Sequence, residues 1–505
     1  MNKVLLRGAF LAAALALSSC ESETPMDVAA KQMNVAGTNS IRLVGNGTWG
    51  MVGQQFSNSG AWAQIPVTNY TMTVDYTTGA SHVQMTRAEP SDADKIPNTA
   101  FRKEYFAFLG PKADEYFSGT AAWNATETNP AQVQPAAVAE RAAAVHSTPH
   151  GFIKLALENK AQFRETRRGG DTTFTVGNQK FYGRFNTQGD LELVQTWIDN
   201  PVLGDTLVQT TFQDYKIYGG VRYPSRITRI VGEHPALRLT VTGVSANVPA
   251  AVTVPEEVKN YQAPPITVAE ELLAPGVWHL RGGSHHSLLI DQLDHLVIVE
   301  APQHEARSQA VIAKAKELVP NKPIRFVINT HTHFDHSGGL RAYVAEGATI
   351  VTNAVNEEYY KKAWANPRTM NPDAMAKAKA APKFQAVGDK YTLSDGKRSI
   401  DVYAMRGLNH TDSMLMTHLP TEKVIFVSDV YAPSPADAPP PEAPIPGAVA
   451  LIENMERTGA VDVTKVAGGH GSRVGSVEDL LVDAGRMKPT AKAKAKAKAK
   501  PAPAP

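Results

Sequence analysis

Four potential metal ligands lie within one short segment of the chain, THTHFDHSGG (330–339): His331, His333, Asp335 and His336. The segment follows the apolar run Ile324–Ile328, which predicts a buried strand, and a short helix is expected to start near Gly338. A loop between a strand and a helix turns several side chains towards one point. Imidazole nitrogen and carboxylate oxygen are ligands that Zn²⁺ accepts readily. The segment therefore predicts a metal site.

Three further candidate ligands follow in loops. His410 lies in RGLNHTDSM (406–414), Asp429 ends the apolar run VIFVSD (424–429), and His470 lies between glycines in VAGGHGS (466–472). Loop and strand-end positions are where binding and catalytic groups gather on a rigid scaffold. Strands and helices alternate between residues 268 and 488, which favours a layered α/β domain.

Together, these motifs resemble those of the metallo-β-lactamase superfamily, from about Val277 to Arg473. The resemblance implies an αββα sandwich in the C-terminal half of an α/β protein. It also implies the ligand sets: His331, His333 and His410 for one metal ion, Asp335, His336 and His470 for a second, and Asp429 as a bridge.

The function implied by this resemblance is hydrolysis by a metal-bound hydroxide. Two Zn²⁺ ions would act on a small ester, lactone, β-lactam or phosphodiester, with Asp335 as the catalytic residue that orients the hydroxide. Iron or manganese would accept the same ligands, so the metal stays open at this point. His285 and His286, in GGSHHS, are predicted substrate contacts.

The only cysteine of the 505-residue chain is Cys20, which excludes a disulfide framework and any site built from several cysteines. Lys3 and Arg7 precede the apolar run Gly8–Leu17, as in an export signal. The sequence LSSC that ends this segment resembles the lipobox of bacterial lipoproteins. Residues 1–19 are therefore predicted to be a signal peptide and Cys20 to be lipidated. The chain would be exported and anchored in the cell envelope, at the periplasmic face of the outer membrane in preference to the inner.

Residues 20–35 are predicted to be a polar tether. Residues 36–262 alternate polar and apolar side chains between turn residues, which predicts a mainly antiparallel β-rich domain. One Ala-rich helix is expected from about Ala136 to Ala144. The segment 210–230 resembles the last hairpins of periplasmic half-barrel proteins that carry lipids or lipoproteins. Residues 489–505, rich in Ala, Lys and Pro, are predicted to be a disordered tail.

A formal net charge of +2 gives no electrostatic support for a nucleic-acid partner, so the expected partners are a small-molecule substrate and, through a lipid anchor, a membrane. Nothing in the sequence indicates an oligomeric state. Two alternatives stay open: an envelope lipoprotein that binds a lipid or a partner and carries an auxiliary metal domain, and an iron-dependent redox member of the same superfamily.

Overall fold

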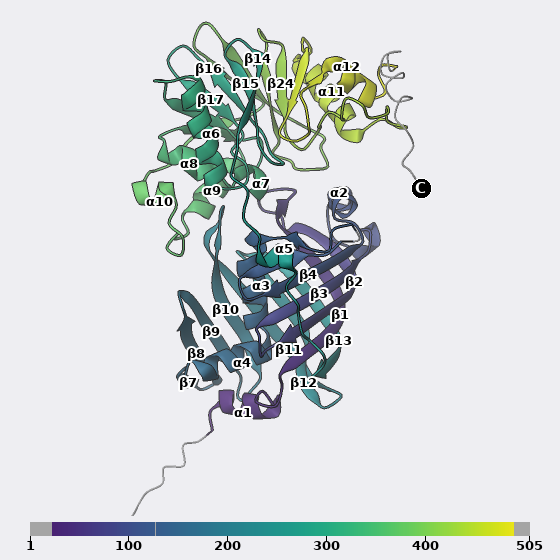
Figure 1. Cartoon of the computed structure of the whole chain (residues 1–505), viewed down its shortest axis with the longest axis vertical. Coiled ribbons are helices and arrows are strands. Elements are labelled where there is room, and N and C mark those ends of the chain that lie inside the picture. The colour runs from purple at the N-terminus through teal and green to yellow at the C-terminus, as the bar shows by residue number, and fades with distance from the viewer. Residues whose placement is uncertain (1–22, 127, 489–505) are drawn as a thin grey trace, which may run out of the picture.

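The computed structural model describes residues 23–488 apart from residue 127, and it has two parts (Figure 1). A β-rich domain is followed by a layered α/β domain. The predicted signal peptide (1–19), the lipidation site Cys20 and the predicted tail (489–505) lie outside the described residues. Within the described part of the chain, no helix has the length and apolar character needed to cross a membrane.

One antiparallel sheet of 13 strands forms the β-rich domain. Buried and partly exposed residues alternate along strands such as β10, because successive side chains point to opposite faces of a sheet. In sheet order the strands are β6 (Gln132–Val133), β5 (Ala121–Asn124), β4 (Lys112–Ser118), β3 (Ala80–Arg87), β2 (Trp62–Asp75), β1 (Ser40–Gln55), β13 (His234–Ala246), β12 (Val221–Val231), β11 (Gly204–Tyr218), β10 (Leu191–Asn200), β9 (Gln179–Phe185), β8 (Gly169–Val176) and β7 (Phe163–Thr166).

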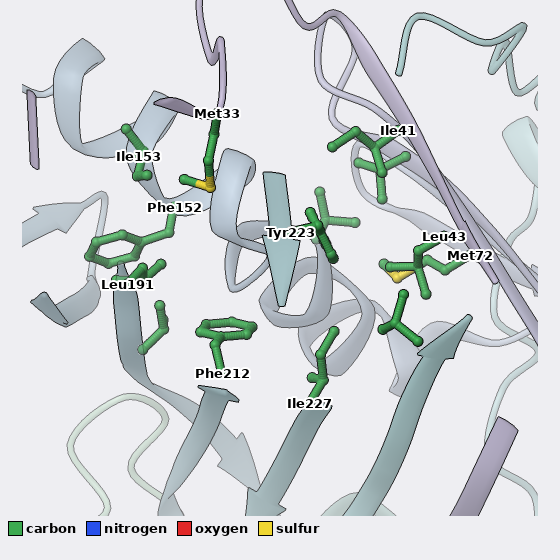
Figure 2. Close-up of a cluster of buried hydrophobic side chains, with 14 of the residues drawn as sticks. Met33, Ile41, Leu43, Met72, Phe152, Ile153, Leu191, Phe212, Tyr223 and Ile227 are labelled. Carbon is green, nitrogen blue, oxygen red and sulfur yellow. The ribbon is translucent and has the colours of Figure 1, made fainter. Parts of the chain in front are cut away.

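The sheet wraps around helices. Phe152 and Ile153 of one helix, α4, belong to a buried cluster that also holds Leu43 of β1 and Phe212 of β11, although β1 and β11 are not neighbours in the sheet (Figure 2). The helices of this domain are α1 (Pro25–Gln32), α2 (Thr99–Leu109), α3 (Val138–His146), α4 (Pro149–Glu158) and α5 (Glu256–Lys259), with short 3-10 turns η1 (Asp92–Asp94) and η2 (Pro135–Ala137). The helix expected at 136–144 is α3, shifted by two residues.

The prediction of a polar tether over 20–35 is wrong for its described part. Thr24 caps α1 through a reciprocal pair of hydrogen bonds with Asp27. Met26, Ala29 and Met33 are buried in the core of the β-rich domain. Their spacing of three and then four residues places them on one helical face, a signal hidden by the polar residues around them.

Two sheets form the C-terminal domain, and the predicted αββα sandwich is confirmed. The first sheet has the order β14 (Ala269–Ala274), β15 (Val277–Arg281), β16 (Ser287–Asp291), β17 (Leu296–Val299), β18 (Ile324–Ile328), β19 (Thr349–Asn353) and β20 (Lys383–Val387). The second has the order β21 (Lys390–Ser394), β22 (Ser399–Ala404), β23 (Leu415–Leu419), β24 (Val424–Val427), β25 (Lys465–Gly468) and β26 (Gly475–Ser476).

Helices cover the outer faces of both sheets. One apolar cluster lies between the sheets and joins, among others, Val299 and Phe426. Further clusters lie under the helices of each sheet, around Val311 on one side and Leu451 on the other. The helices are α6 (Glu305–Leu318), α7 (Phe334–Ser337), α8 (Leu340–Ala345), α9 (Asn356–Trp364), α10 (Ala374–Ala378), α11 (Pro446–Thr458) and α12 (Val477–Asp483).

Candidate metal centre

The seven predicted ligands come together at one edge of the sandwich. His331 and His333 lie in the loop after β18, and α7 carries Asp335 and His336. The other three follow strands of the second sheet: His410 after β22, Asp429 after β24 and His470 after β25. Because each loop follows a buried strand, the two sheets fix the backbone positions of these residues.

Three histidines converge on one oxygen of Asp429. His331 Nε2 lies 2.9 Å from His333 Nδ1 and 3.4 Å from Asp429 Oδ2, and His410 Nε2 lies 2.9 Å from the same oxygen. His410 Nε2 is buried and makes no hydrogen bond of acceptable geometry with any described residue. A buried nitrogen without a well-formed hydrogen bond fits a metal ligand, because an ion would displace the proton of this ring and accept its lone pair.

The other oxygen of Asp429 faces a second set of ligands. His336 Nε2 and His470 Nε2 lie 2.9 Å and 2.7 Å from Asp429 Oδ1. Asp335 Oδ2 lies 3.5 Å from His336 Nε2. Two groups of side chains that share Asp429 can each hold a metal ion. The first consists of His331, His333, His410 and Asp429, and the second of Asp335, His336 and Asp429.

Most of these histidines are held through the nitrogen that points away from the centre. His336 Nδ1 lies 2.6 Å from Glu300 Oε2, His470 Nδ1 donates to the carbonyl of Ser284 at 2.8 Å, and His331 Nδ1 lies 3.0 Å from the hydroxyl of Thr330. A partner on one ring nitrogen fixes the ring orientation and leaves the other nitrogen free for an ion. Glu300 is fully buried, and its second oxygen accepts from the backbone N–H of Thr330 at 2.9 Å.

Burial and charge divide the histidines into two kinds. Burial lowers the pKa of His331 and lowers that of His333 well below its ordinary value, so both rings are neutral and can donate a lone pair. Burial also lowers the pKa of His410, but Asp429 and Glu104 outweigh it and raise the pKa to about 9. Burial raises the pKa of Asp429, whereas the charges of His336 and His410 hold it well below its usual range. Asp429 is therefore an anion that requires cations around it.

The candidate ligands differ in their exposure to solvent. His331 and His333 are fully buried, whereas the side chains of Asp335 and His470 are 38% and 29% exposed. His285 lies beside them, with Nε2 at 3.3 Å from Asp335 Oδ2, and with His336 and His470 it forms another group able to hold a metal. The neighbouring His286 turns away and donates from Nε2 to the carbonyl of Gly471 at 2.7 Å.

Four residues of the β-rich domain, which sequence reasoning missed, contact the candidate ligands. His333 Nε2 donates to the carbonyl of Gln55 at 2.8 Å, and Gln54 Nε2 donates to Asp335 Oδ1 at 2.8 Å. Glu104 Oε1 accepts from His410 Nδ1 at 2.6 Å. The hydroxyl of Tyr105 lies 3.3 Å from His333 Nδ1. No motif marks these four residues; only the folded arrangement of the two domains brings them to the centre.

Comparison with known families agrees with this geometry. The family model described as the Metallo-beta-lactamase superfamily matches residues 280–488. The matched segment includes all seven predicted ligands, and the resemblance predicted from the motifs is confirmed for this part of the chain. No curated protein matches the sequence of this chain.

Solved structures similar to this chain include several metallo-beta-lactamases. The enzyme from Hirschia baltica is 19% identical, with 44% of this chain and 99% of that chain covered and a TM-score of 0.32. The enzyme from Pontibacter korlensis is 15% identical, with coverages of 44% and 98% and a TM-score of 0.32. For FIM-1 from Pseudomonas aeruginosa the identity is 16%, the coverages are 44% and 95%, and the TM-score is 0.33.

Proposed function

We propose that this chain, whose residues 280–488 form a metallo-β-lactamase-superfamily domain, is a hydrolase that uses two Zn²⁺ ions. The observation that carries the proposal is the position of Asp429. One of its oxygens lies among His331, His333 and His410, and the other lies beside His336 and His470. A carboxylate that offers each oxygen to a separate set of ligands is the arrangement expected of a bridge between two ions.

Two bound zinc ions would supply a hydroxide nucleophile at neutral pH, because Zn²⁺ lowers the pKa of its water to about 7. The residues of the chain orient the reactants. Asp335 is partly exposed, and its Oδ2 faces the centre and can accept a hydrogen bond from the nucleophile. His285 Nε2, next to that oxygen, can donate to an oxygen of the substrate. The buried side around His333 keeps bulk water away, which strengthens electrostatic interactions at the centre.

A substrate panel tests the proposal. The mature full-length chain is assayed with a chromogenic ester, lactone, β-lactam and phosphodiester, before and after chelation, and after return of zinc, iron or manganese. We expect turnover of one of these classes that chelation abolishes and zinc restores. Full metal content without turnover of any of the four classes would overturn the hydrolase, and restoration by iron alone would favour the redox alternative.

Removal of the Asp335 carboxylate tests the catalytic role of this residue. Asp335→Ala should lower kcat by more than about 100-fold, beyond the 10- to 100-fold typical of groups outside the ligand shell. Asp462→Asn is the control, because Asp462 is a largely exposed carboxylate of the same domain, paired with Lys423. Near-normal turnover by Asp335→Ala at full metal content would contradict the role given to Asp335.

We also propose that the chain is an exported lipoprotein anchored through Cys20. The support is the sequence alone: a basic start, an apolar run and the chain's single cysteine at the end of LSSC. Cys20→Ser should abolish incorporation of labelled palmitate and move the protein from the membrane fraction to the soluble one. Because the chain has no second cysteine, labelled palmitate retained on the variant would refute the anchor.

A cavity in the β-rich domain favours a second candidate function, that of a lipid carrier. The cavity, of about 220 Å³, lies between the sheet and α3 and is lined by apolar side chains such as Trp49 and Met72 and by the charged Glu115, Arg141 and Arg229. An acyl chain with an anionic end would suit such a lining. Displacement of a fluorescent fatty acid from the full chain, with Met72→Trp as the variant that fills the cavity, tests this candidate. Fatty-acid capture without turnover would favour the carrier over the hydrolase.

A further inference from the structure

Two segments of the β-rich domain reach the metal centre. One is the end of β1, with Gln54 and Gln55, and the other is α2, with the neighbouring residues Glu104 and Tyr105. β1 contacts α7, and both segments lie at the junction of the two domains (Figure 1). The contacts join residues far apart in sequence: Glu104 and His410 are separated by 306 positions.

We propose that the β-rich domain completes the metal centre, with Glu104, Gln54 and Tyr105 as positioning residues for the ligands His410 and Asp335. The proposal rests on the metal-dependent function proposed above. It assigns to the β-rich domain a direct role in metal affinity and in the geometry of the reacting groups, in place of a role as spacer or anchor.

The first contact orients His410. The carboxylate of Glu104 lies 2.6 Å from His410 Nδ1, which directs Nε2 of the same ring towards Asp429 Oδ2. A carboxylate on the outer nitrogen of a ligand histidine fixes its tautomer and raises its basicity. In the C-terminal domain, Glu300 has this role for His336. For His410 the carboxylate comes from the other domain.

The second contact orients Asp335 through a chain of two hydrogen bonds. The hydroxyl of Tyr105 donates to Gln54 Oε1 at 2.5 Å, which fixes the amide of Gln54 with its NH₂ group towards Asp335. That NH₂ group donates to Asp335 Oδ1 at 2.8 Å. With Oδ1 engaged, Oδ2 is the oxygen that faces His336 and His285. Gln54 thus selects which oxygen of the catalytic carboxylate is offered to the centre.

The junction between the domains is packed tightly enough to hold this geometry. Trp62 of β2, almost fully buried, meets the ring of Phe334 edge to face at 6.0 Å. Asn58 donates to Asn356 Oδ1 at 2.8 Å and accepts from the hydroxyl of Thr332 at the same distance. Apolar packing and side-chain hydrogen bonds together limit movement between the domains, as positioning within about 0.5 Å requires.

The same arrangement limits how a substrate enters. The β-rich domain lies over His333 and His410, and the most exposed side chains among the candidate ligands are those of Asp335 and His470. We therefore expect a substrate to approach beside Asp335, across the second set of ligands. Truncation of Gln54 would alter Asp335 at this entrance, so it should change kcat more than KM.

The experiment compares full-length variants by metal affinity as well as by turnover. Glu104→Ala, Gln54→Ala and Tyr105→Phe are titrated with Zn²⁺ in competition with a chromogenic chelator, and the absorption spectrum of the Co²⁺ form reports ligand geometry. The controls remove the same groups elsewhere in the domain: Glu192→Ala, whose carboxylate pairs with Arg184, and Tyr76→Phe, whose hydroxyl bonds Thr148.

We expect Glu104→Ala to bind zinc about 10- to 100-fold more weakly, with an altered Co²⁺ spectrum, while both controls match the wild type. Glu104→Gln, which keeps a hydrogen-bond acceptor without the charge, should recover part of the affinity. Wild-type affinity and spectrum in all three variants would overturn the proposal. Because these readouts need no substrate, they decide the proposal even if the panel finds no hydrolysis. If the wild type hydrolyses a substrate while all three variants bind zinc as the wild type does, the proposed hydrolase function is retained and only the role of the β-rich domain is refuted.

Discussion

Gly53 offers the sharpest test of the contact between the domains. It lies near the end of β1 with φ at +79°, and a Cβ added there would stand 2.4 Å from Cγ of Phe334. Phe334 is the first residue of α7 and lies between the candidate ligands His333 and Asp335. The Gly53→Ala variant therefore places one methyl group between the β-rich domain and the residue that joins two metal ligands.

The expected cost has two parts. A non-glycine residue in the left-handed region costs about 1–2 kcal/mol. To reach the 3.5–4.0 Å at which carbon atoms pack, the ring of Phe334 or the strand must move by about 1–1.5 Å. Overpacking of this kind costs about 1–3 kcal/mol, so the variant should lose about 2–5 kcal/mol in total.

Gly79→Ala is the matched control. Gly79 has φ at +69° in the turn between β2 and β3, and a Cβ there would meet nothing within 4 Å. It should cost only the backbone part, about 1–2 kcal/mol. Urea unfolding followed by tryptophan fluorescence, in which Trp62 reports on the junction, gives the stability difference. Zinc titration should show about 10-fold weaker binding for Gly53→Ala alone. Equal stability losses and equal zinc affinities in the two variants would refute the packing of β1 on Phe334.

Three further predictions concern the metal centre and one buried histidine. Chelation should lower the melting temperature of the wild type, because an ion present at 1,000 times its Kd stabilises the folded state by about 4 kcal/mol; calorimetry that finds the same melting temperature with and without chelator would argue against metal binding. Glu300→Gln should weaken zinc binding about 10- to 100-fold, since the charge behind His336 is lost, whereas Glu317→Gln, at an exposed site on α6, should not; the same titration distinguishes them. Burial lowers the pKa of His150 from its ordinary value of 6.5 to about 4. Between these two pH values the unfolded chain binds a proton at this residue and the folded chain does not. The free energy of unfolding therefore keeps its full value above pH 6.5 and falls by up to about 3 kcal/mol as the pH approaches 4. His150→Gln should remove that part of the pH dependence in urea unfolding, and parallel curves for variant and wild type would contradict it.

The parts of the fold that local sequence determines were predictable. The strand expected at Ile324–Ile328 has the bounds of β18, and the helix expected from about Ala136 to Ala144 overlaps α3. Both are set by apolar periodicity and by residues that end the element nearby. The convergence of the seven candidate ligands was predictable for the same reason, because each lies close to a strand or a glycine turn that the sequence itself marks.

The contribution of the β-rich domain was not predictable in this way. Gln54 is one of two glutamines that end a strand, and Glu104 lies on a short helix with no repeat or motif around it. Their partners Asp335 and His410 are 281 and 306 positions away. These contacts form only when the two folded domains dock on each other. No local pattern in a single sequence shows how two domains dock.

Coupling between the domains must act in both directions. If Glu104 strengthens metal binding by orienting His410, then a bound ion strengthens the contact between α2 and the His410 loop by the same free energy, because linkage between two equilibria is reciprocal. The apolar packing of Trp62 on Phe334 keeps the two domains ordered before an ion binds. In a loosely attached domain, the entropy cost of ordering on metal binding would offset the coupling free energy. A metal site shared across a domain junction thus gives a physical reason for the β-rich domain and the C-terminal domain to be joined in one chain: each fixes the geometry that the other requires.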